Sequence, residues 1–247
     1  MTAPTGSPAR ARADYGLDAP GVVRTMALLA VGLIGCGLIL QAVAASAGQR
    51  LGQTLLWPGS SFAITTCLML ASSRYGKLRA RDRLLDYLHL TGSESVLDVG
   101  CGHGLMLIGA AHRLPNGHAV GLDLWSQTDQ LANSAAATLA NAEAEDVGSR
   151  VTVRDGDMRA LPFDDASMDV VVSSLAIHNV PTVPERADAI REIVRVVRPG
   201  GRAAIIDIAH VGAYAREFRS AGWAIEHRGF TPWIFPPTQE LVARKPA

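Results

Sequence analysis

The feature that most constrains this chain is a run of glycines directly after a short apolar strand. Residues 95–99 have the pattern of a buried strand, and Gly100, Gly102 and Gly104 follow at alternate positions before a helical pattern begins at Leu105. Glycine adopts backbone torsions that are closed to other residues and lets a ligand approach the chain closely. The start of the following helix offers unpaired N–H groups to a polar or anionic ligand. This arrangement indicates a nucleotide-type cofactor site, although dinucleotide-binding enzymes use a related glycine turn.

Three acidic residues near the glycines narrow the choice. Asp98 lies inside the strand, where a carboxylate can orient the glycine loop or accept a hydrogen bond from a positively charged ligand. Asp123 ends a second apolar strand about 20 residues later, at the distance where an acid binds a pair of ribose hydroxyls. Asp157 lies in an acidic turn after a third strand. A dinucleotide-binding interpretation explains neither Asp98 nor this turn. The purely structural alternatives are a tight strand-to-helix turn, a solvated Asp123 and a capping role for Asp157.

At four motifs, taken in order, the chain resembles the class I S-adenosylmethionine-dependent methyltransferases. The segment VLDVGCGHG at 96–104 is similar to their glycine-rich motif, GLDL at 121–124 to their ribose-binding acid, and GDMRALPF at 156–163 to their adenine-binding turn. The runs at 163–172 and 191–202 resemble those of ubiquinone/menaquinone-type C-methyltransferases and many small-molecule O-methyltransferases. The resemblance covers residues 79–244 and is specific for fold and cofactor, but not for the substrate.

The resemblance implies that S-adenosylmethionine binds at the glycine-rich loop and the acids around it. The implied cofactor-binding residues are Asp98, Gly100, Cys101, Gly102, Gly104, Asp123, Leu124, Asp157, Met158 and Ser173. The three cysteines predict neither disulfides nor a metal site, and we find no zinc-ligand spacing.

Alternating strand and helix patterns predict an α/β fold, a Rossmann-like seven-stranded sheet with helices on both faces. By resemblance, the final strand inserts antiparallel. A further helix at 76–90 is expected to join this domain to the region before it. The expected strands lie near 95–99, 118–122, 151–154, 168–173, 202–207, 223–228 and 239–244, and the expected helices near 104–113, 127–143, 184–198 and 212–221.

Two uncharged stretches precede the α/β domain. The first, at 26–47, is almost wholly apolar and long enough to cross the hydrocarbon core of a bilayer. The second, at 51–73, is less apolar, and a helix that starts near Trp57 would tolerate Pro58 in its first turn. The alternative is a pair of apolar helices that cover the domain or form a dimer interface.

These stretches predict three parts of the chain: a flexible N-terminus at 1–20, an apolar helical hairpin at 21–75 and a methyltransferase domain at 76–247. The hairpin would contact the membrane through residues 25–73. Residues 1–83 carry nine basic and three acidic side chains, with only Arg50 between the two stretches. By the positive-inside rule, both ends of the hairpin and the catalytic domain face the cytoplasm. The domain itself is not basic, which argues against nucleic acid as a partner. The sequence is compatible with a homo-oligomer.

Two histidines are candidate catalytic groups. His178 follows the fourth expected strand of the domain and His210 the fifth, at the sheet edge where α/β folds bind ligands. We expect them to converge on the transferred methyl group, where either could accept a proton from the acceptor. Each could equally be a loop histidine or a structural hydrogen-bonding group.

Only a few residues separate Asp207 from the next helical pattern, at 214–221, too few for a substantial lid at that point. We therefore expect residues 77–90, the turn at 231–235 or the membrane face to cover the site, and the acceptor to be lipophilic. The predicted function is O- or C-methylation of a hydrophobic small molecule at the membrane surface. The alternatives are a tethered methyltransferase of a soluble metabolite and a non-catalytic S-adenosylmethionine-binding module.

Overall fold

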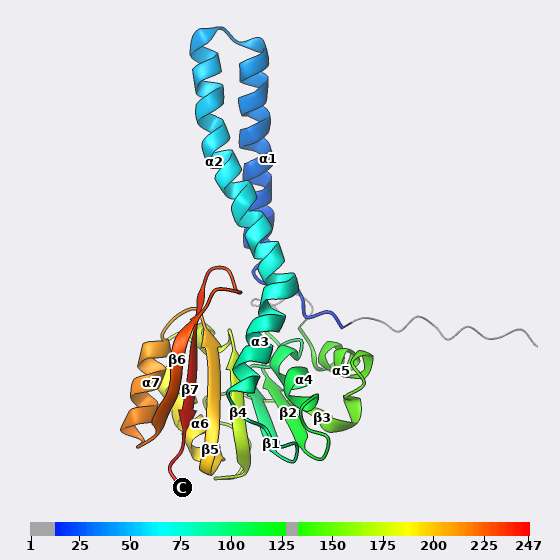
Figure 1. The fold of residues 1–247 in the computed structure, drawn as a ribbon, viewed down its shortest axis with the longest axis vertical. Coiled ribbons are helices and arrows are strands. Elements are labelled where there is room, and N and C mark those ends of the chain that lie inside the picture. The colour runs from blue at the N-terminus through cyan, green and yellow to red at the C-terminus, as the bar shows by residue number, and fades with distance from the viewer. Residues whose placement is uncertain (1–12, 127–132) are drawn as a thin grey trace, which may run out of the picture.

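The computed structural model describes residues 13–126 and 133–247. An α/β domain carries a long two-helix hairpin that projects from one edge of its sheet (Figure 1). The predicted α/β fold with two preceding apolar helices is confirmed.

The sheet has seven strands in the order β3-β2-β1-β4-β5-β7-β6. Strands β1 to β5 are parallel, and β7 lies antiparallel between β5 and β6. The antiparallel last strand agrees with the resemblance. Parallel strands end at the same edge, so the segments that follow β1, β2, β3 and β4 meet there. The strands are β1 Ser95–Val99, β2 His118–Asp123, β3 Val151–Asp155, β4 Met168–Ser174, β5 Val197–Asp207, β6 Ala224–Thr231 and β7 Thr238–Arg244.

Helices cover both faces of the sheet. Because side chains alternate along a strand, Val96 of β1 packs into the core beneath α3, α4 and α5, and Leu97 into the core beneath α6 and α7. Two 3-10 turns, at Gly148–Arg150 and Ile177–Asn179, precede β3 and follow β4. The helix expected at 127–143 starts at Ala135, and residues 127–132 lie outside the described part. The helices are α3 Lys77–Asp86, α4 Leu105–Ala111, α5 Ala135–Ala144, α6 Val183–Val196 and α7 Val211–Ser220.

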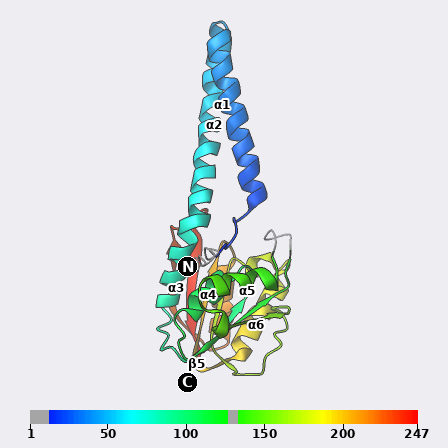
Figure 2. The same cartoon turned by 90° about the vertical axis from the view of Figure 1, so that its right-hand side faces the viewer.

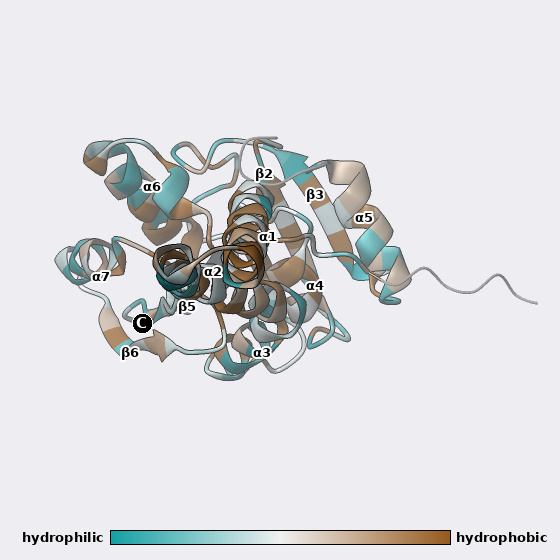
Figure 3. Ribbon diagram, turned by 90° about the horizontal axis from the view of Figure 1, so that it is seen from above, coloured by the Kyte–Doolittle hydropathy of each residue, from teal (hydrophilic) through white to brown (hydrophobic). Residues whose placement is uncertain are grey.

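The hairpin consists of α1 Pro20–Val43 and α2 Ser46–Ala71, and a π-helical turn, η1 Ser72–Gly76, continues α2 into α3. At 1.5 Å per residue, α1 is about 36 Å long. Both legs are long and apolar enough to cross a membrane, by length and composition alone. Seen from above, brown apolar residues dominate α1 (Figure 3). Exposed apolar side chains cover the hairpin: Val22, Leu28, Leu29, Val31, Leu38, Ile39, Val43, Leu51, Trp57, Ile64, Leu68 and Leu70.

Glycines bring the two legs into close contact. A Cβ on Gly37 would lie 2.8 Å from the carbonyl oxygen of Gly52, and a Cβ on Gly59 would lie 2.8 Å from the side chain of Ile34. Pro58 lies inside α2, which starts at Ser46, so the start near Trp57 that the sequence would have tolerated is not observed. A proline in a helix interior is tolerated where tertiary packing holds the helix on both sides of it.

Residues 13–19, here called the strap, make specific contacts, although the sequence predicted a flexible N-terminus through residue 20. The buried ammonium of Lys77 donates to the carbonyl oxygens of Tyr15 (2.9 Å) and Gly16 (2.6 Å), and pairs with Asp18 at 3.3 Å. At the other end of the strap, the backbone N–H of Asp14 donates to Asn141 of α5. The strap therefore links the helix that continues the hairpin to the face of the α/β domain. Residues 1–12 lie outside the described part.

Candidate active site

The glycine loop turns sharply from β1 into α4. Gly100 and Gly104 have φ values of 74° and 84°, in the region that L-residues with a side chain rarely adopt. A Cβ on Gly100 would lie 2.3 Å from the Cβ of Ala176. The loop is fastened to β2, because the N–H of Gly100 donates to the carbonyl oxygen of Leu122 at 2.8 Å. Only glycine fits at Gly100, and the backbone is exposed there to whatever occupies the space above it.

Asp98 performs one structural task and keeps one oxygen free. Its Oδ2 accepts from the backbone N–H of Leu107 in α4 at 2.8 Å, which orients the loop. Its Oδ1 is buried and has no hydrogen-bond partner among the residues that the structure describes. Burial raises the pKa of Asp98 to about 8. An unsatisfied buried carboxylate oxygen is costly, so this position suits a donor or a cation supplied by a ligand.

Asp123 is held by the loop that it faces. One carboxylate oxygen accepts from the backbone N–H of Gly102 at 2.8 Å, and the other accepts from the backbone N–H of Trp125 at 2.7 Å and the side chain of Asn133 at 3.2 Å. Burial, with the nearby charges of Asp98 and Asp123, raises the pKa of the Cys101 thiol. These contacts hold the Asp123 carboxylate rigidly at the end of β2.

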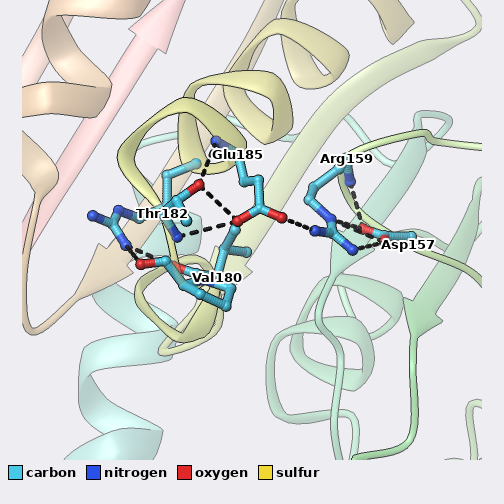
Figure 4. Close-up of polar contacts among 7 residues, drawn as sticks. Asp157, Arg159, Val180, Thr182 and Glu185 are labelled. Atoms are coloured by element: carbon cyan, nitrogen blue, oxygen red, sulfur yellow. Dashed lines mark hydrogen bonds and ion pairs between the residues drawn. The ribbon is translucent and has the colours of Figure 1, made fainter.

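Asp157 is engaged by a neighbouring guanidinium. Arg159 donates through Nε to both Asp157 oxygens at 3.0 Å and also pairs with Glu185 at the start of α6 (Figure 4). Hydrogen bonds from Arg159 lower the pKa of Asp157. Thr182 and Glu185 form a capping box that fixes the start of α6. A ligand that contacts Asp157 therefore meets a carboxylate already locked in place.

His178 contacts a buried acid. Its Nδ1 lies 2.6 Å from Oδ1 of Asp207, whose side chain is fully buried at the end of β5. Asp207 is itself fixed by the backbone N–H groups of His178 and Ile208 and, at 3.3 Å, by the hydroxyl of Tyr214. Nδ1 contacts Asp207 without the alignment of a hydrogen bond. Nε2 is the other ring nitrogen, which can act on another molecule.

One cavity of about 1100 Å³ brings these residues together. Most of the predicted site residues line it: Asp98, Gly100, Cys101, Gly102, Asp123, Leu124, Asp157, Met158 and His178. Drug-sized ligands occupy pockets of roughly 300–1,000 Å³, so this cavity can hold a cofactor and a second molecule side by side. In the described part of the chain, no group of three or more His, Cys, Asp and Glu residues could hold a metal ion.

Three predicted residues do not line the cavity. Gly104 caps the start of α4. Ser173 is buried and donates to the carbonyl oxygen of Val99, so it fastens β4 to β1, and the next residue, Ser174, lines the cavity instead. His210 is an exposed residue at the start of α7 with a φ of 64°, so the expected convergence of His178 and His210 is not observed.

Sequence reasoning also missed several residues that line the cavity. Asn133 lies beside Asp123, Tyr15 and Asp18 come from the strap, and Ile234 and Phe235 come from the β6–β7 turn. The turn was among the covers we expected. Of the segment at 77–90, only Lys77 lines the cavity, because Leu84, Leu85 and Leu88 face the sheet and pack into its core.

Comparisons with known proteins agree with this geometry. Residues 97–205 match the family model described as "Methyltransferase domain". This part of the chain is thus similar to S-adenosylmethionine-dependent methyltransferase domains. The chain is 36% identical over 131 residues to "Ubiquinone/menaquinone biosynthesis C-methyltransferase UbiE" of Dinoroseobacter shibae, covering 53% of this chain and 49% of that protein. It is 35% identical over 132 residues to "27-O-demethylrifamycin SV methyltransferase" of Amycolatopsis mediterranei, covering 52% and 44%. The chain thus spans about half the length of these curated relatives.

Solved structures share the fold of this methyltransferase domain. The [4+2]-cyclase SpnF superposes with a TM-score of 0.58 at 20% identity, covering 69% of this chain and 82% of the cyclase. A geranyl diphosphate methyltransferase in complex with SAM superposes with a TM-score of 0.56 at 16% identity, covering 69% and 85%. At these identities the likeness establishes the fold alone.

The cavity fits the predicted cofactor of the methyltransferase domain. The free oxygen of Asp98 suits the positively charged end of S-adenosylmethionine, and the bare backbone at Gly100 allows close approach. Asp123 sits at the end of β2, where an acid accepts hydrogen bonds from a ribose, and Asp157 and Met158 line the same cavity.

Proposed function

We propose that this protein transfers a methyl group from S-adenosylmethionine to a lipophilic small molecule at the cytoplasmic surface of a membrane. The observation that carries the proposal is the single cavity. It joins the glycine loop and its acids to His178 and to residues at the base of the apolar hairpin, among them Val22 and Met69. Cofactor, proton acceptor and an apolar entrance thus share one space.

The His178–Asp207 pair supports catalysis over mere cofactor binding. When bound, S-adenosylmethionine supplies an electrophilic methyl group on a sulfonium leaving group. Nε2 of His178 would accept the proton that an acceptor hydroxyl gives up as its oxygen bonds to the methyl carbon. Asp207 would keep the imidazole in the tautomer with Nδ1–H and stabilise the imidazolium that forms. This pair favours O-methylation, although the same base could deprotonate an activated carbon.

The exposed apolar surface of the hairpin supports membrane insertion. A soluble protein rarely exposes so large an apolar area, and both legs pass the length and composition criteria for a span. Arg24, Arg74 and Arg79 lie at the base of the hairpin, next to the domain, whereas Arg50 is the only basic residue near its tip. By the positive-inside rule, this asymmetry supports a domain on the cytoplasmic side.

The names of several relatives agree with a lipophilic acceptor. One, from Thermosynechococcus vestitus, is a "2-phytyl-1,4-naphtoquinone methyltransferase" that is 31% identical over 154 residues and is covered over 60% of its length. We extend this to a substrate class only: a ring that bears an acidic O–H or C–H group and a hydrocarbon tail.

The test is a transfer experiment with the full chain in detergent or vesicles. The protein is incubated with methyl-labelled S-adenosylmethionine and a whole-cell extract, which is then separated into lipid and aqueous fractions. We expect label in the lipid fraction, and none with Asp98→Ala. Label only in the aqueous fraction would make the hairpin a tether for an enzyme of soluble metabolites. Cofactor binding without label in either fraction would favour a non-catalytic binding module, a role that the fold alone permits.

A further inference from the structure

The cavity continues upward from the glycine loop to the base of the hairpin. Its upper wall includes Gly21 and Val22 in the first turn of α1, Met69 in the last turn of α2, and Ile234 and Phe235 in the β6–β7 turn. Figure 2 shows the lower ends of α1 and α2 standing apart above the domain, while their upper parts run together. Both legs of the hairpin therefore border the same space.

The polarity of the cavity wall changes from one end to the other. The hairpin end includes the apolar side chains of Val22, Met69 and Ile234 beside the charged Asp18, Arg24 and Lys77, and the opposite end includes the carboxylates of Asp98 and Asp123. An occupant that fits both ends has a hydrocarbon part toward the hairpin and a polar part near the glycine loop. A small hydrophilic metabolite would leave the apolar end without a partner.

The close contact between the legs restricts where such an occupant can pass. Gly37 and Gly52 bring the two backbones together in the upper half of the hairpin, and Gly59 packs on Ile34. A hydrocarbon chain cannot pass between backbones in van der Waals contact. The base of the hairpin lacks glycine pairs of this kind among the described residues, and there the cavity lies between the legs.

We propose that the gap between the lower ends of α1 and α2 is the entrance for the acceptor. The head of a tailed phenol or quinol passes from the bilayer between Val22 and Met69 toward His178, and its tail stays between the legs. This inference rests on the proposed function in taking the hairpin to be inserted in a bilayer and the acceptor to be lipophilic. It assigns Gly21, Val22 and Met69 to acceptor entry, and they have no role in cofactor binding.

Two glycines on one leg provide a matched pair of variants. A Cβ on either Gly21 or Gly32 would meet nothing within 4 Å, so a side chain can start at either position without a clash. Gly21 lines the cavity, and Gly32 lies higher on α1, away from it. Gly21→Trp should therefore block the entrance, whereas Gly32→Trp should leave it open. Val22→Trp is a second blocking variant, because the Val22 side chain is partly exposed.

The experiment uses the full chain in phosphatidylcholine vesicles that contain a phenol with a long alkyl tail and a photoreactive diazirine at the start of the tail. After illumination, cross-linked residues are mapped by mass spectrometry, and S-adenosylmethionine binding is measured for every variant. We expect cross-links to Val22, Met69 and Ile234 in the original chain and in Gly32→Trp. These should fall at least tenfold in Gly21→Trp and Val22→Trp, with cofactor binding unchanged.

Cross-links confined to the outer surface of the hairpin, at residues such as Val31 and Leu38, would overturn the proposal. So would cavity cross-links that persist in both blocking variants. Because cross-linking needs no turnover, it is independent of the methyl-transfer test. Cavity cross-links without methyl transfer would support the proposed entrance and contradict the proposed methyltransferase activity. Methyl transfer without cavity cross-links would support the activity and contradict the entrance.

Discussion

Replacing Asp98 with asparagine should stabilise the cofactor-free protein while weakening cofactor binding. The side chain is 1% exposed, and burial raises its pKa from an ordinary value of 3.8 to about 8. At pH 7 the unfolded chain carries an ionised Asp98, whereas the folded protein holds it mostly protonated. The contribution of Asp98 to the free energy of unfolding therefore falls as the pH rises above 3.8. It stops falling at about pH 8, where Asp98 ionises in the folded protein as well.

The size of the effect follows from this difference. From 3.8 to pH 7 is about three pH units, and each unit corresponds to about 1.4 kcal/mol, so Asp98 lowers the free energy of unfolding by about 4 kcal/mol at pH 7. Asparagine keeps an acceptor for the N–H of Leu107 and has no charge to lose. Asp98→Asn should accordingly unfold at higher temperature than the original chain at pH 7, and the two should converge toward pH 4.

The assay is thermal unfolding of the detergent-solubilised chain between pH 4 and pH 8.5, together with calorimetric titration of S-adenosylmethionine. A cation that binds beside Asp98 favours the ionised carboxylate, so cofactor binding should release a proton and become tighter as the pH rises from 6 to 8. Asp98→Asn should lose both the proton release and this pH dependence. If the variant is less stable at pH 7, or keeps the same pH dependence of binding, the account of Asp98 is refuted.

Three further predictions concern the site and its cover. His178→Ala should lower the rate of methyl transfer by about 10²- to 10⁴-fold with cofactor affinity unchanged, and His210→Ala, outside the cavity, should have no effect on labelled-methyl kinetics. Gly100→Ala should abolish cofactor binding in calorimetry and lower the free energy of unfolding by about 1–3 kcal/mol, because the new Cβ would meet Ala176 and the φ of Gly100 is positive. Normal cofactor binding in this variant would contradict a close approach of the cofactor to the backbone at Gly100. Lys77→Met should free the strap, seen as faster amide hydrogen exchange at Tyr15 and a loss of about 1–3 kcal/mol in stability; unchanged exchange would show that the strap holds without it.

The sequence predicted the fold well because local and periodic signals dominate there. The first strand was expected at 95–99 and lies at Ser95–Val99, since its apolar run ends at glycines that cannot continue it. The error at Pro58 has the opposite origin. A proline inside a helix reads locally as a boundary, and only the packing of α2 on α1 through Gly52 and Gly59 overrides it.

The site was predicted in part, and its failures are also physical. Ser173 was expected at the cofactor, but its side chain holds β4 to β1. Side chains alternate along a strand, so the neighbouring position points to the other side and lines the cavity. His210 starts a helix in a left-handed conformation that gives no sequence signal. The contact of Lys77 with Tyr15 joins residues 62 positions apart, and no local pattern reports such a pairing.

The junction between hairpin and domain has a consequence for how the protein works. The π-helical turn at Ser72–Gly76 is clamped by the β6–β7 turn: the hydroxyl of Ser72 accepts from the N–H of Phe235 at 2.8 Å, and Gly76 leaves no room for a Cβ beside Trp233. These contacts fasten the hairpin to the domain. If the hairpin is inserted in a bilayer as proposed, they would fix the height of the cavity relative to the membrane, and the protein would meet acceptors by diffusion in the plane of the membrane. Each residue inserted into the π-helical turn would move the domain about 1.5 Å along the hairpin axis and rotate it by roughly 100°. The length of this turn would therefore determine how far the cavity lies from the membrane.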